Sequence, residues 1–322
     1  MPRTAQTTSD APVRAGGGRG WIKALIVLLV VAGLLAGAAF WALHKLGNLS
    51  IFRNTGCTAS SAAGSTSLDL EQAKNASTIA AVGLSLGVSG FGVQVAEATA
   101  MQESKLHDLD YGDRDSVGLF QQRPSQGWGT SAQILDPVYA STKFYQALLQ
   151  VSGWQRMSLT EAAQAVQHSG SPSAYAQHEQ PASIVTAVFT GTAGAGLGCT
   201  LDGPTFAAQA KGSQLLTARG QTVVNDLRAQ FGTANVGKVS GIAADGLSFD
   251  IAAPAAVSSG TTAQRAWAYA NWATAQAETL GIAKVSYGGK TWSASDGGSG
   301  WKADSSATAG GGAVHIVMVN GS

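Results

Sequence analysis

The sequence predicts three structural classes in succession: a transmembrane helix near the N-terminus, an all-α domain and an α+β domain. Three observations predict this order. Twenty residues without a charge lie between Lys23 and His44, alanine-rich apolar patterns at helical spacing run from Leu68 to Ala195, and short β-type runs around one long helical pattern fill the rest. At about 150 residues per domain, 322 residues allow two globular domains.

The composition narrows the range of partners. Lys and Arg together number 20 against 19 Asp and Glu, so the formal net charge is +1. A nucleic-acid-binding surface needs a clustered excess of basic residues, which this balance does not supply. Charged residues make up only 12% of the chain, about half the usual fraction, which indicates an uncharged polar surface or a membrane-embedded segment.

The uncharged run predicts the membrane segment. Residues 21–44 are expected to form a single transmembrane helix, with Trp21 and Trp41 at interfacial positions. The basic residues of the preceding segment predict that residues 1–20 form a disordered cytoplasmic tail. We therefore expect a single-pass protein of the cell membrane with most of the chain extracytoplasmic. A cleaved signal peptide is the alternative, because the small residues Ala36, Gly37 and Ala38 fit a cleavage site.

Two cysteines, Cys57 and Cys199, lie on the predicted exported side, where disulfides form. We expect them to pair around the first domain, although two separate thiols remain the alternative.

The domain boundaries follow from changes in pattern. A stalk over residues 45–67 precedes a helical domain over 68–198, with helical patterns at Ile79–Leu86, Val93–Met101, Val138–Val151 and Leu159–Val166. A Gly- and Pro-containing linker covers residues 199–206. The α+β domain covers 207–322, with helical patterns at Ala207–Phe231 and Thr262–Leu280 and β-type runs at Leu247–Ala252, Ala283–Tyr287 and Val314–Val319.

Residues 96–129 are the most informative stretch for chemistry. A helical pattern ends in Glu103-Ser104, and an aspartate-rich loop then leads to Gly118-Leu119-Phe120-Gln121-Gln122. On a helix Glu97 and Glu103 point about 120° apart and cannot easily share one site. The aspartate cluster lacks the spacing of a calcium-binding loop, so we predict no metal there and no cofactor elsewhere.

This two-part motif resembles the lysozyme-like domain of soluble lytic transglycosylases and goose-type lysozymes, as found in a group of exported actinobacterial proteins. The resemblance covers roughly residues 75–190 and implies a lysozyme-like fold for the all-α domain. It also implies that Glu103 is the catalytic acid, with the Gly-Leu-Phe-Gln-Gln turn packed beside it.

Cleavage of the β-1,4 bond after N-acetylmuramic acid needs a proton for the leaving oxygen. The apolar neighbours Ala100, Met101 and Leu106 are predicted to keep Glu103 from water, the condition under which a carboxyl stays protonated near neutrality. In the family the C6 hydroxyl of the muramic acid then closes on C1, whereas Asp113 or Asp115 holding a water would make the reaction hydrolytic. Both outcomes stay open.

The sequence departs from the family downstream. The usual Ala-Tyr-Asn is replaced by Ala165-Val166-Gln167, and Tyr175 is a candidate to fill the place of the missing tyrosine. Amides and an indole face suit sugar binding. The predicted substrate-binding residues are Ser104, Gln121, Gln122, Trp128, Gln167 and Tyr175, while His168 and His178 are predicted to lie at the surface or behind the site.

Residues 207–322 resemble zinc-dependent D,D-carboxypeptidase-like domains more faintly. Asp250 and His315 match two family positions, but Ala243 and Ala313 stand where active members carry histidine. Because catalytic zinc needs three protein ligands, we predict an inactive domain with a vestigial pair and no bound metal.

Taken together, these observations predict a membrane-anchored muramidase of the lytic transglycosylase type that acts on peptidoglycan glycan strands through Glu103. The alternative is a non-catalytic cell-wall-binding scaffold in a surface assembly. Protein partners in the cell envelope are left open, and nucleic acid is excluded.

Overall fold

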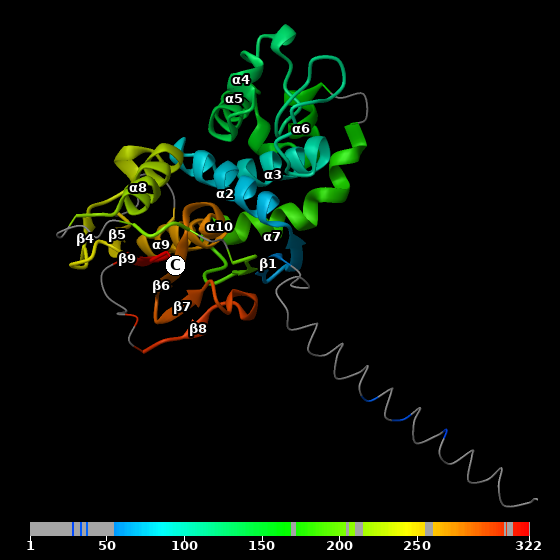
Figure 1. Ribbon diagram of the computed structural model, residues 1–322. Coiled ribbons are helices and arrows are strands. Elements are labelled where there is room, and N and C mark those ends of the chain that lie inside the picture. Colours follow the sequence, from blue (N-terminus) through cyan, green and yellow to red (C-terminus); the bar gives the residue numbers. More distant parts are fainter. Residues whose placement is uncertain are drawn as a thin grey trace, which may run out of the picture. The chain divides into compact units, whose positions relative to one another are not determined.

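The computed structural model describes residues 55–168, 172–203, 206–209, 215–254, 260–305, 307 and 312–321, together with Leu28, Gly33 and Gly37. The chain divides into two compact units, residues 1–53 and 54–322. Every helix and strand with assigned bounds belongs to the second unit (Figure 1).

The predicted membrane span is corrected by the structure. In the described part of the chain, no helix is both long enough and apolar enough to cross a membrane. Even α2 (Leu70–Ser85), with 16 residues, is shorter than the roughly 20 that a span requires. Of residues 21–44 only Leu28, Gly33 and Gly37 are described, so the rest of the predicted span lies outside the described residues. The predicted single-pass membrane localisation therefore loses its basis.

The N-terminal part of the second unit is built mainly of helices. They are α2, α3 (Gly90–Ser104), α4 (Ser131–Ile134), α5 (Pro137–Gln150), α6 (Leu159–Gln167) and α7 (Glu179–Phe189), with the 3-10 turns η2 (Pro124–Gln126), η3 (Trp154–Arg156) and η4 (Pro172–His178). The helical patterns predicted from the sequence fall on α2, α3, α5 and α6. Polar N-cap side chains begin most of these helices, among them Asp69, Ser89 and Ser158.

Helix α2 is the centre of this part and packs against α3, α5 and α7 (Figure 1). Ten residues of α2 between Ala73 and Gly83 are buried, and most of them are small. Ala73, Ala76, Ile79 and Ala80 have no exposed surface. At Gly83 a methyl group would lie 2.8 Å from the hydroxyl of Tyr145. Small residues therefore let α5 approach α2 closely.

An all-α domain is nevertheless wrong, because this part also contains an antiparallel sheet. Strands β1 (Gly56–Ser61), β2 (Gly64–Leu68) and β3 (Leu197–Thr200) pair in the order β2-β1-β3. The first two strands lie mainly in the segment predicted as a stalk, and β3 spans the predicted junction between the helical domain and the linker. The strands are short and rich in Ser, Thr and Gly, so their buried side chains, such as Cys57 and Ala59, give only a weak alternating signal.

The C-terminal part combines helices with a six-stranded sheet, as the α+β prediction requires. Helices α8 (Ala218–Phe231), α9 (Thr262–Ala275) and α10 (Ala277–Leu280) accompany η5 (Thr233–Asn235) and η6 (Gly297–Ser299). The antiparallel sheet has the order β4-β5-β9-β6-β7-β8, made of β4 (Val239–Ser240), β5 (Ser248–Ala252), β6 (Ile282–Tyr287), β7 (Lys290–Ser293), β8 (Lys302–Ala303) and β9 (Ala313–Met318).

One hydrophobic core runs through both parts, and buried polar contacts join them. Asn271 on α9 is fully buried, and its Nδ2 donates to the carbonyls of Val188 at 2.8 Å and Gly194 at 2.7 Å. Gln276 Nε2 lies 3.1 Å from the Ser77 hydroxyl on α2. The predicted boundary at residues 199–206 remains a prediction.

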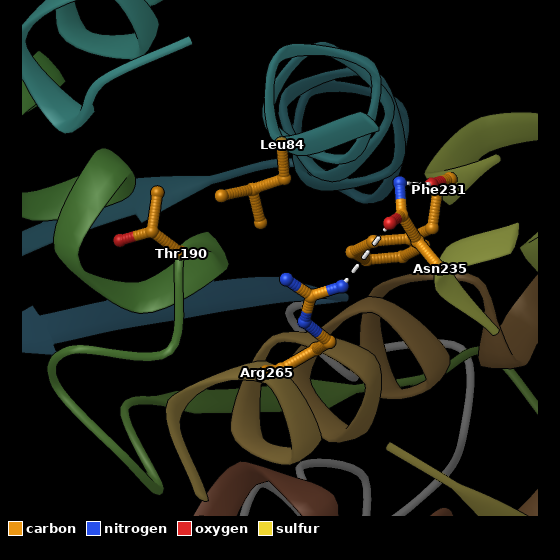
Figure 2. A pocket seen from close by; sticks show the side chains of 5 residues that line it. All are labelled: Leu84, Thr190, Phe231, Asn235 and Arg265. Atoms are coloured by element: carbon orange, nitrogen blue, oxygen red, sulfur yellow. Dashed lines mark hydrogen bonds between the residues drawn. The ribbon is translucent and has the colours of Figure 1, made fainter. Parts of the chain in front are cut away.

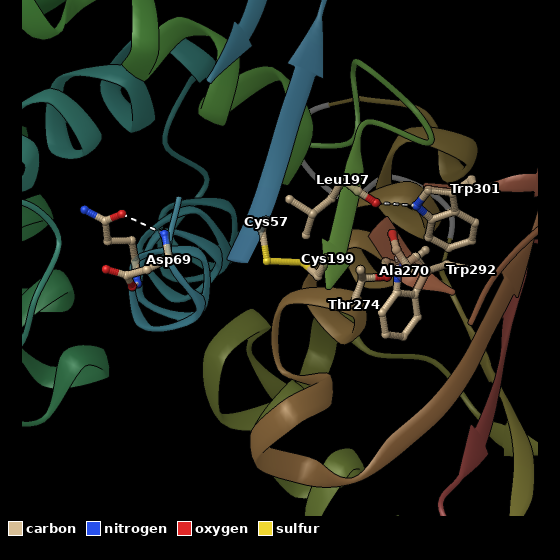
Figure 3. Close-up of a disulfide and its surroundings, with 10 residues drawn as sticks. Cys57, Asp69, Leu197, Cys199, Ala270, Thr274, Trp292 and Trp301 are labelled. Carbon is tan, nitrogen blue, oxygen red and sulfur yellow. Dashed lines mark hydrogen bonds between the residues drawn. A yellow bond between two sulfur atoms is a disulfide. The ribbon is translucent and has the colours of Figure 1, made fainter. Parts of the chain in front are cut away.

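The predicted disulfide is present. Cys57 on β1 and Cys199 on β3 face each other in register, both buried, and close a loop with a sequence separation of 142. Figure 3 shows the bridge between the two strands, with Trp301 donating from Nε1 to the carbonyl of Leu197 at 2.9 Å. The bridge thus ties the strand that enters the helical part to the strand that leaves it.

Removing this disulfide should lower the free energy of unfolding by up to about 5 kcal/mol, because the unfolded chain regains the entropy of a long open loop. Denaturant unfolding of the double variant Cys57→Ala/Cys199→Ala measures the loss. Reductant in the unfolding buffer should move the wild-type midpoint to that of the variant and leave the variant unchanged. A wild-type midpoint that ignores reductant contradicts the prediction.

Candidate active site

Glu103 lies at the C-terminal end of α3, one residue before the helix ends, and is half-buried. The helix stops because Lys105 and Leu106 adopt left-handed conformations, with φ of 56° and 64°. Backbone N–H groups of these two residues close the helix end by donating to the carbonyls of Met101 and Ala100. The carboxyl is therefore fixed at a sharp turn of the chain.

Glu103 lines a cleft of about 800 Å³. This volume lies within the range of ligand-binding pockets in proteins. Its walls come from the end of α3, the loop after it, α5 and the end of α6. The described lining residues are Glu103, Asp113, Ser116, Gln121, Gln122, Arg123, Gln126, Trp128, Ala147, Gln150, Ala165, Val166, Gln167 and His168. Glutamine side chains dominate the polar surface, so the cleft offers many uncharged donors and acceptors.

Tyr175 reaches the carboxyl of Glu103 from η4. Its hydroxyl donates to Glu103 Oε1 at 2.8 Å, and the side chain is fully buried. The two residues are 72 positions apart in the chain, and the fold brings them together. A donor held at this distance from a carboxyl oxygen orients that carboxyl.

Ser104 and Gln167 bind the motif turn itself. Ser104 is buried, and its hydroxyl donates to the Leu119 carbonyl at 2.8 Å. Gln167 Nε2 donates to the Phe120 carbonyl at 2.8 Å while the residue also lines the cleft. Side-chain hydrogen bonds thus join the end of α3 and α6 to the Gly-Leu-Phe turn. The Ser104 hydroxyl is bonded to the backbone of this turn and is not among the described residues that line the cleft.

The amides of Gln121 and Gln122 are partly used within the wall. Gln121 has a φ of 47°, and its Nε2 donates to the carbonyls of Tyr111 and Gly118, both at 3.3 Å. Gln122 is buried and donates from Nε2 to Ala140 at 3.2 Å. Both hold the loop that forms the cleft, and Gln121 also presents its side chain to it.

Trp128 stands half-buried in the cleft wall. Its carbonyl accepts a hydrogen bond from the Tyr139 hydroxyl at 3.2 Å, which fixes the end of the loop against α5. The structure therefore places Gln121, Gln122, Trp128 and Gln167 around the same cleft as Glu103.

The two aspartates proposed from the sequence differ in role. Asp115 accepts hydrogen bonds from the Ser125 backbone at 2.8 Å, from Arg123 Nε at 2.8 Å and from the Ser125 hydroxyl at 3.0 Å. These bonds hold the pKa of Asp115 well below its usual range. Asp115 is therefore a structural anchor of the loop, whereas Asp113 is exposed and lines the cleft.

Sequence reasoning missed several lining residues. Gln126 lies in the informative loop, and its polar character next to the motif could have marked it. Gln150 ends α5, far from the motif in sequence, and carried no signal. His168, predicted as a surface or supporting residue, lines the cleft, while His178 lies 3.1 Å from Gln102 Oε1.

A second cavity, of about 20 Å³, lies between Leu84, Thr190, Phe231, Asn235 and Arg265 (Figure 2). Arg265 donates from Nη1 to Asn235 Oδ1 at 3.4 Å. This volume holds about one water molecule. Of these two, the cleft at Glu103 is therefore the better candidate for a polymeric ligand.

In the C-terminal part His315 on β9 and Asp250 on β5 are paired across the sheet, with Nδ1 and Oδ1 2.7 Å apart. Among the residues that the structure describes, no group of three His, Cys, Asp or Glu side chains is placed to hold a metal ion. The pair can orient an imidazole, but it does not make up the three-ligand set of a zinc enzyme.

Residues 212–311 match the family model described as VldE, C-terminal domain. The matched segment lies in the part that resembles a carboxypeptidase-like domain in sequence. It does not extend to the helical part that carries Glu103. No curated protein matches the chain.

Glu97 lies six residues before Glu103 on α3 but points into the core, so the two carboxyls do not share a site. It is fully buried, and among the described residues neither carboxyl oxygen has a hydrogen-bond partner. Burial raises the pKa of Glu97 well above its ordinary value. Burial and the Glu97 charge likewise raise the pKa of Tyr145. The core therefore favours a neutral Glu97.

This buried acid predicts a pH-dependent stability. The folded protein keeps a proton that the unfolded chain releases above about pH 4.5, so the free energy of unfolding should fall as pH rises past that value. One group contributes at most about 1.4 kcal/mol per pH unit. Denaturant unfolding between pH 4 and 8 should show this slope, and Glu97→Gln should remove it. The exposed Glu179→Gln is the matched control, and an unchanged slope in Glu97→Gln contradicts the prediction.

Proposed function

We propose that the protein is a muramidase of the lytic transglycosylase type that cleaves the β-1,4 bond between N-acetylmuramic acid and N-acetylglucosamine. The observation that carries the proposal is a carboxyl, Glu103, in the wall of a cleft of about 800 Å³ with the Tyr175 hydroxyl 2.8 Å from Oε1.

The chemistry needs one carboxyl in two roles. Glu103 donates its proton to the glycosidic oxygen as the C1–O bond breaks, and positive charge develops at C1. The carboxylate then accepts the proton of the C6 hydroxyl of the same muramic acid, and that oxygen bonds to C1. The products are two glycan fragments: one begins with N-acetylglucosamine bearing a new hydroxyl, and the other ends in a 1,6-anhydro muramic acid. Glu103 is protonated again at the end of the cycle.

The lining of the cleft suits this substrate. The amides of Gln121, Gln126 and Gln150 can bond to hydroxyl and acetamido groups, and the Trp128 indole offers a flat apolar face to a sugar ring. The cationic Arg123 is already paired with Asp115, at 2.8 Å. An uncharged, N-acetylated glycan backbone fits such a surface better than a polyanion does.

Glu103→Gln should abolish glycan cleavage while leaving the melting temperature nearly unchanged, because glutamine keeps the shape of the side chain but cannot donate the acid's proton. Release of soluble muropeptides from purified sacculi measures activity. The exposed Glu179→Gln serves as the control and should keep full activity. Cleavage by Glu103→Gln at the wild-type rate would remove the assignment.

Tyr175→Phe should lower kcat about 10-fold, the effect of a hydrogen bond to a charged group worth roughly 1.5 kcal/mol, with little change in KM. Steady-state kinetics on soluble glycan strands measures both constants. Tyr139→Phe, which removes a hydroxyl bonded to the Trp128 carbonyl, is the matched control. An equal effect of the two substitutions would contradict a specific role for Tyr175.

A non-catalytic scaffold that binds cell-wall glycan is the second candidate. Two observations favour it: Gln167 stands where the family has asparagine, and the Asp250–His315 pair lacks a third ligand in the described part of the C-terminal sheet. Mass spectrometry of digests separates the cases. Anhydro-muropeptides support transglycosylation, reducing ends indicate hydrolysis, and retention of glycan without any product supports the scaffold.

A further inference from the structure

The turn after Glu103 adopts an unfavourable backbone conformation. Lys105 and Leu106 are consecutive non-glycine residues with φ of 56° and 64°, and the Leu106 side chain is only 1% exposed. A left-handed conformation costs such residues roughly 1–2 kcal/mol each. Interactions elsewhere in the fold must therefore hold this turn in place.

The first turns of α2 supply those interactions. Gln72 Nε2 donates to the Lys105 carbonyl at 2.9 Å, and Asn75 Nδ2 donates to the Leu106 carbonyl at 2.7 Å. Asn75 is itself 1% exposed, and its Oδ1 has no hydrogen-bond partner in the described part of the chain. The side-chain hydrogen bond described for Asn75 is thus made to the carbonyl of Leu106, a residue in the left-handed conformation.

The next two residues of the turn are bound from the same helix. Glu71 Oε1 accepts from the Asp108 backbone N–H at 3.1 Å, and Glu71 Oε2 lies 3.2 Å from His107 Nδ1. His107 Nε2 lies 3.3 Å from Asp69 Oδ2. We call Asp69, Glu71, Gln72 and Asn75 the turn clamp, because together they hold all four residues from Lys105 to Asp108.

Gln72 links the clamp to the start of its own helix. Its Oε1 accepts from the Asp69 backbone N–H at 2.8 Å in a capping box, while its Nε2 reaches the other helix. One amide group therefore fixes the N-terminus of α2 and the C-terminus of α3 relative to each other.

The clamped turn is only two residues from Glu103. The His107 N–H donates to the Ser104 carbonyl at 3.1 Å, and the Ser104 hydroxyl holds the Leu119 carbonyl. A shift of the turn would move the end of α3 relative to both Tyr175 and the motif turn. A misplacement of about 1 Å in a catalytic group can cost about 100-fold in rate.

We propose that Asn75 and Gln72 are positioning residues for Glu103, acting through the left-handed turn at Lys105 and Leu106. This inference rests on the proposed function, since it assigns the two amides to the placement of its catalytic acid. Neither residue is among those that line the cleft, so substrate binding should not depend on them.

The sharpest variant is Gln72→Glu. The carboxylate can still accept from the Asp69 N–H and preserve the capping box, but it has lost the N–H that binds the Lys105 carbonyl. Gln264→Glu is the matched control, because Gln264 holds the same position in the capping box of α9, with the Thr261 N–H 2.7 Å from its Oε1. Asn75→Ala has its own control in Asn271→Ala, a second fully buried asparagine that donates to backbone carbonyls.

We expect Gln72→Glu and Asn75→Ala to lower kcat about 10- to 100-fold with KM within about twofold, at a temperature well below each variant's melting temperature. The two controls should keep wild-type kcat. Adding Lys105→Gly to Asn75→Ala should restore part of kcat, because glycine adopts the left-handed conformation without strain.

The outcomes separate the two proposals. Absence of cleavage by the wild-type protein overturns the proposed function and the clamp's catalytic role with it. An active wild type in which Gln72→Glu matches Gln264→Glu in kcat overturns the clamp alone. If Asn75→Ala fails to fold, Gln72→Glu decides the question, since it keeps the buried asparagine and the helix cap.

Discussion

The close packing of α2 against α3 is the constraint on which the rest of the structure depends. Helix α2 contacts α3, α5 and α7 of the helical part as well as α8 and α9 of the C-terminal part, so it belongs to both. Its small residues allow that crowding, because a methyl group at Gly83 would lie 2.9 Å from the Val93 side chain on α3 and 2.8 Å from the Tyr145 hydroxyl on α5. The apolar face of the helix builds the core, while its first polar residues hold the end of α3.

The packed core and the hydrogen bonds around it fix the positions of the residues in the candidate site. Glu103 ends a helix whose other face is buried, and Ser104, Gln167 and Tyr175 connect that end to the motif turn, α6 and η4. Hydrogen bonds from Arg123 and Ser125 to Asp115 stiffen the opposite wall. The cleft is therefore bordered by segments that are each bonded to another segment, which is the pre-organisation that the proposed reaction requires.

Sequence patterns predicted the helices well where apolar spacing was regular, as in α5, and the cysteine count and context predicted the disulfide. They missed β1, β2 and β3, because strands made of Ser, Thr, Gly and Cys carry little hydrophobic alternation. The Glu-Ser and Gly-Leu-Phe-Gln motifs located Glu103, but the clamp residues Gln72 and Asn75 look like ordinary polar positions of a helix. Their role depends on the left-handed turn at Lys105, which only the fold reveals.

The pairing of β1 with β3 has a consequence for durability. Because Cys57 and Cys199 are joined, the intervening backbone is a covalent ring that contains every described residue lining the cleft. A protease that cuts this ring once produces no free fragment, since both new ends stay attached through sulfur. A nicked molecule thus retains every residue around Glu103 on a single covalent framework.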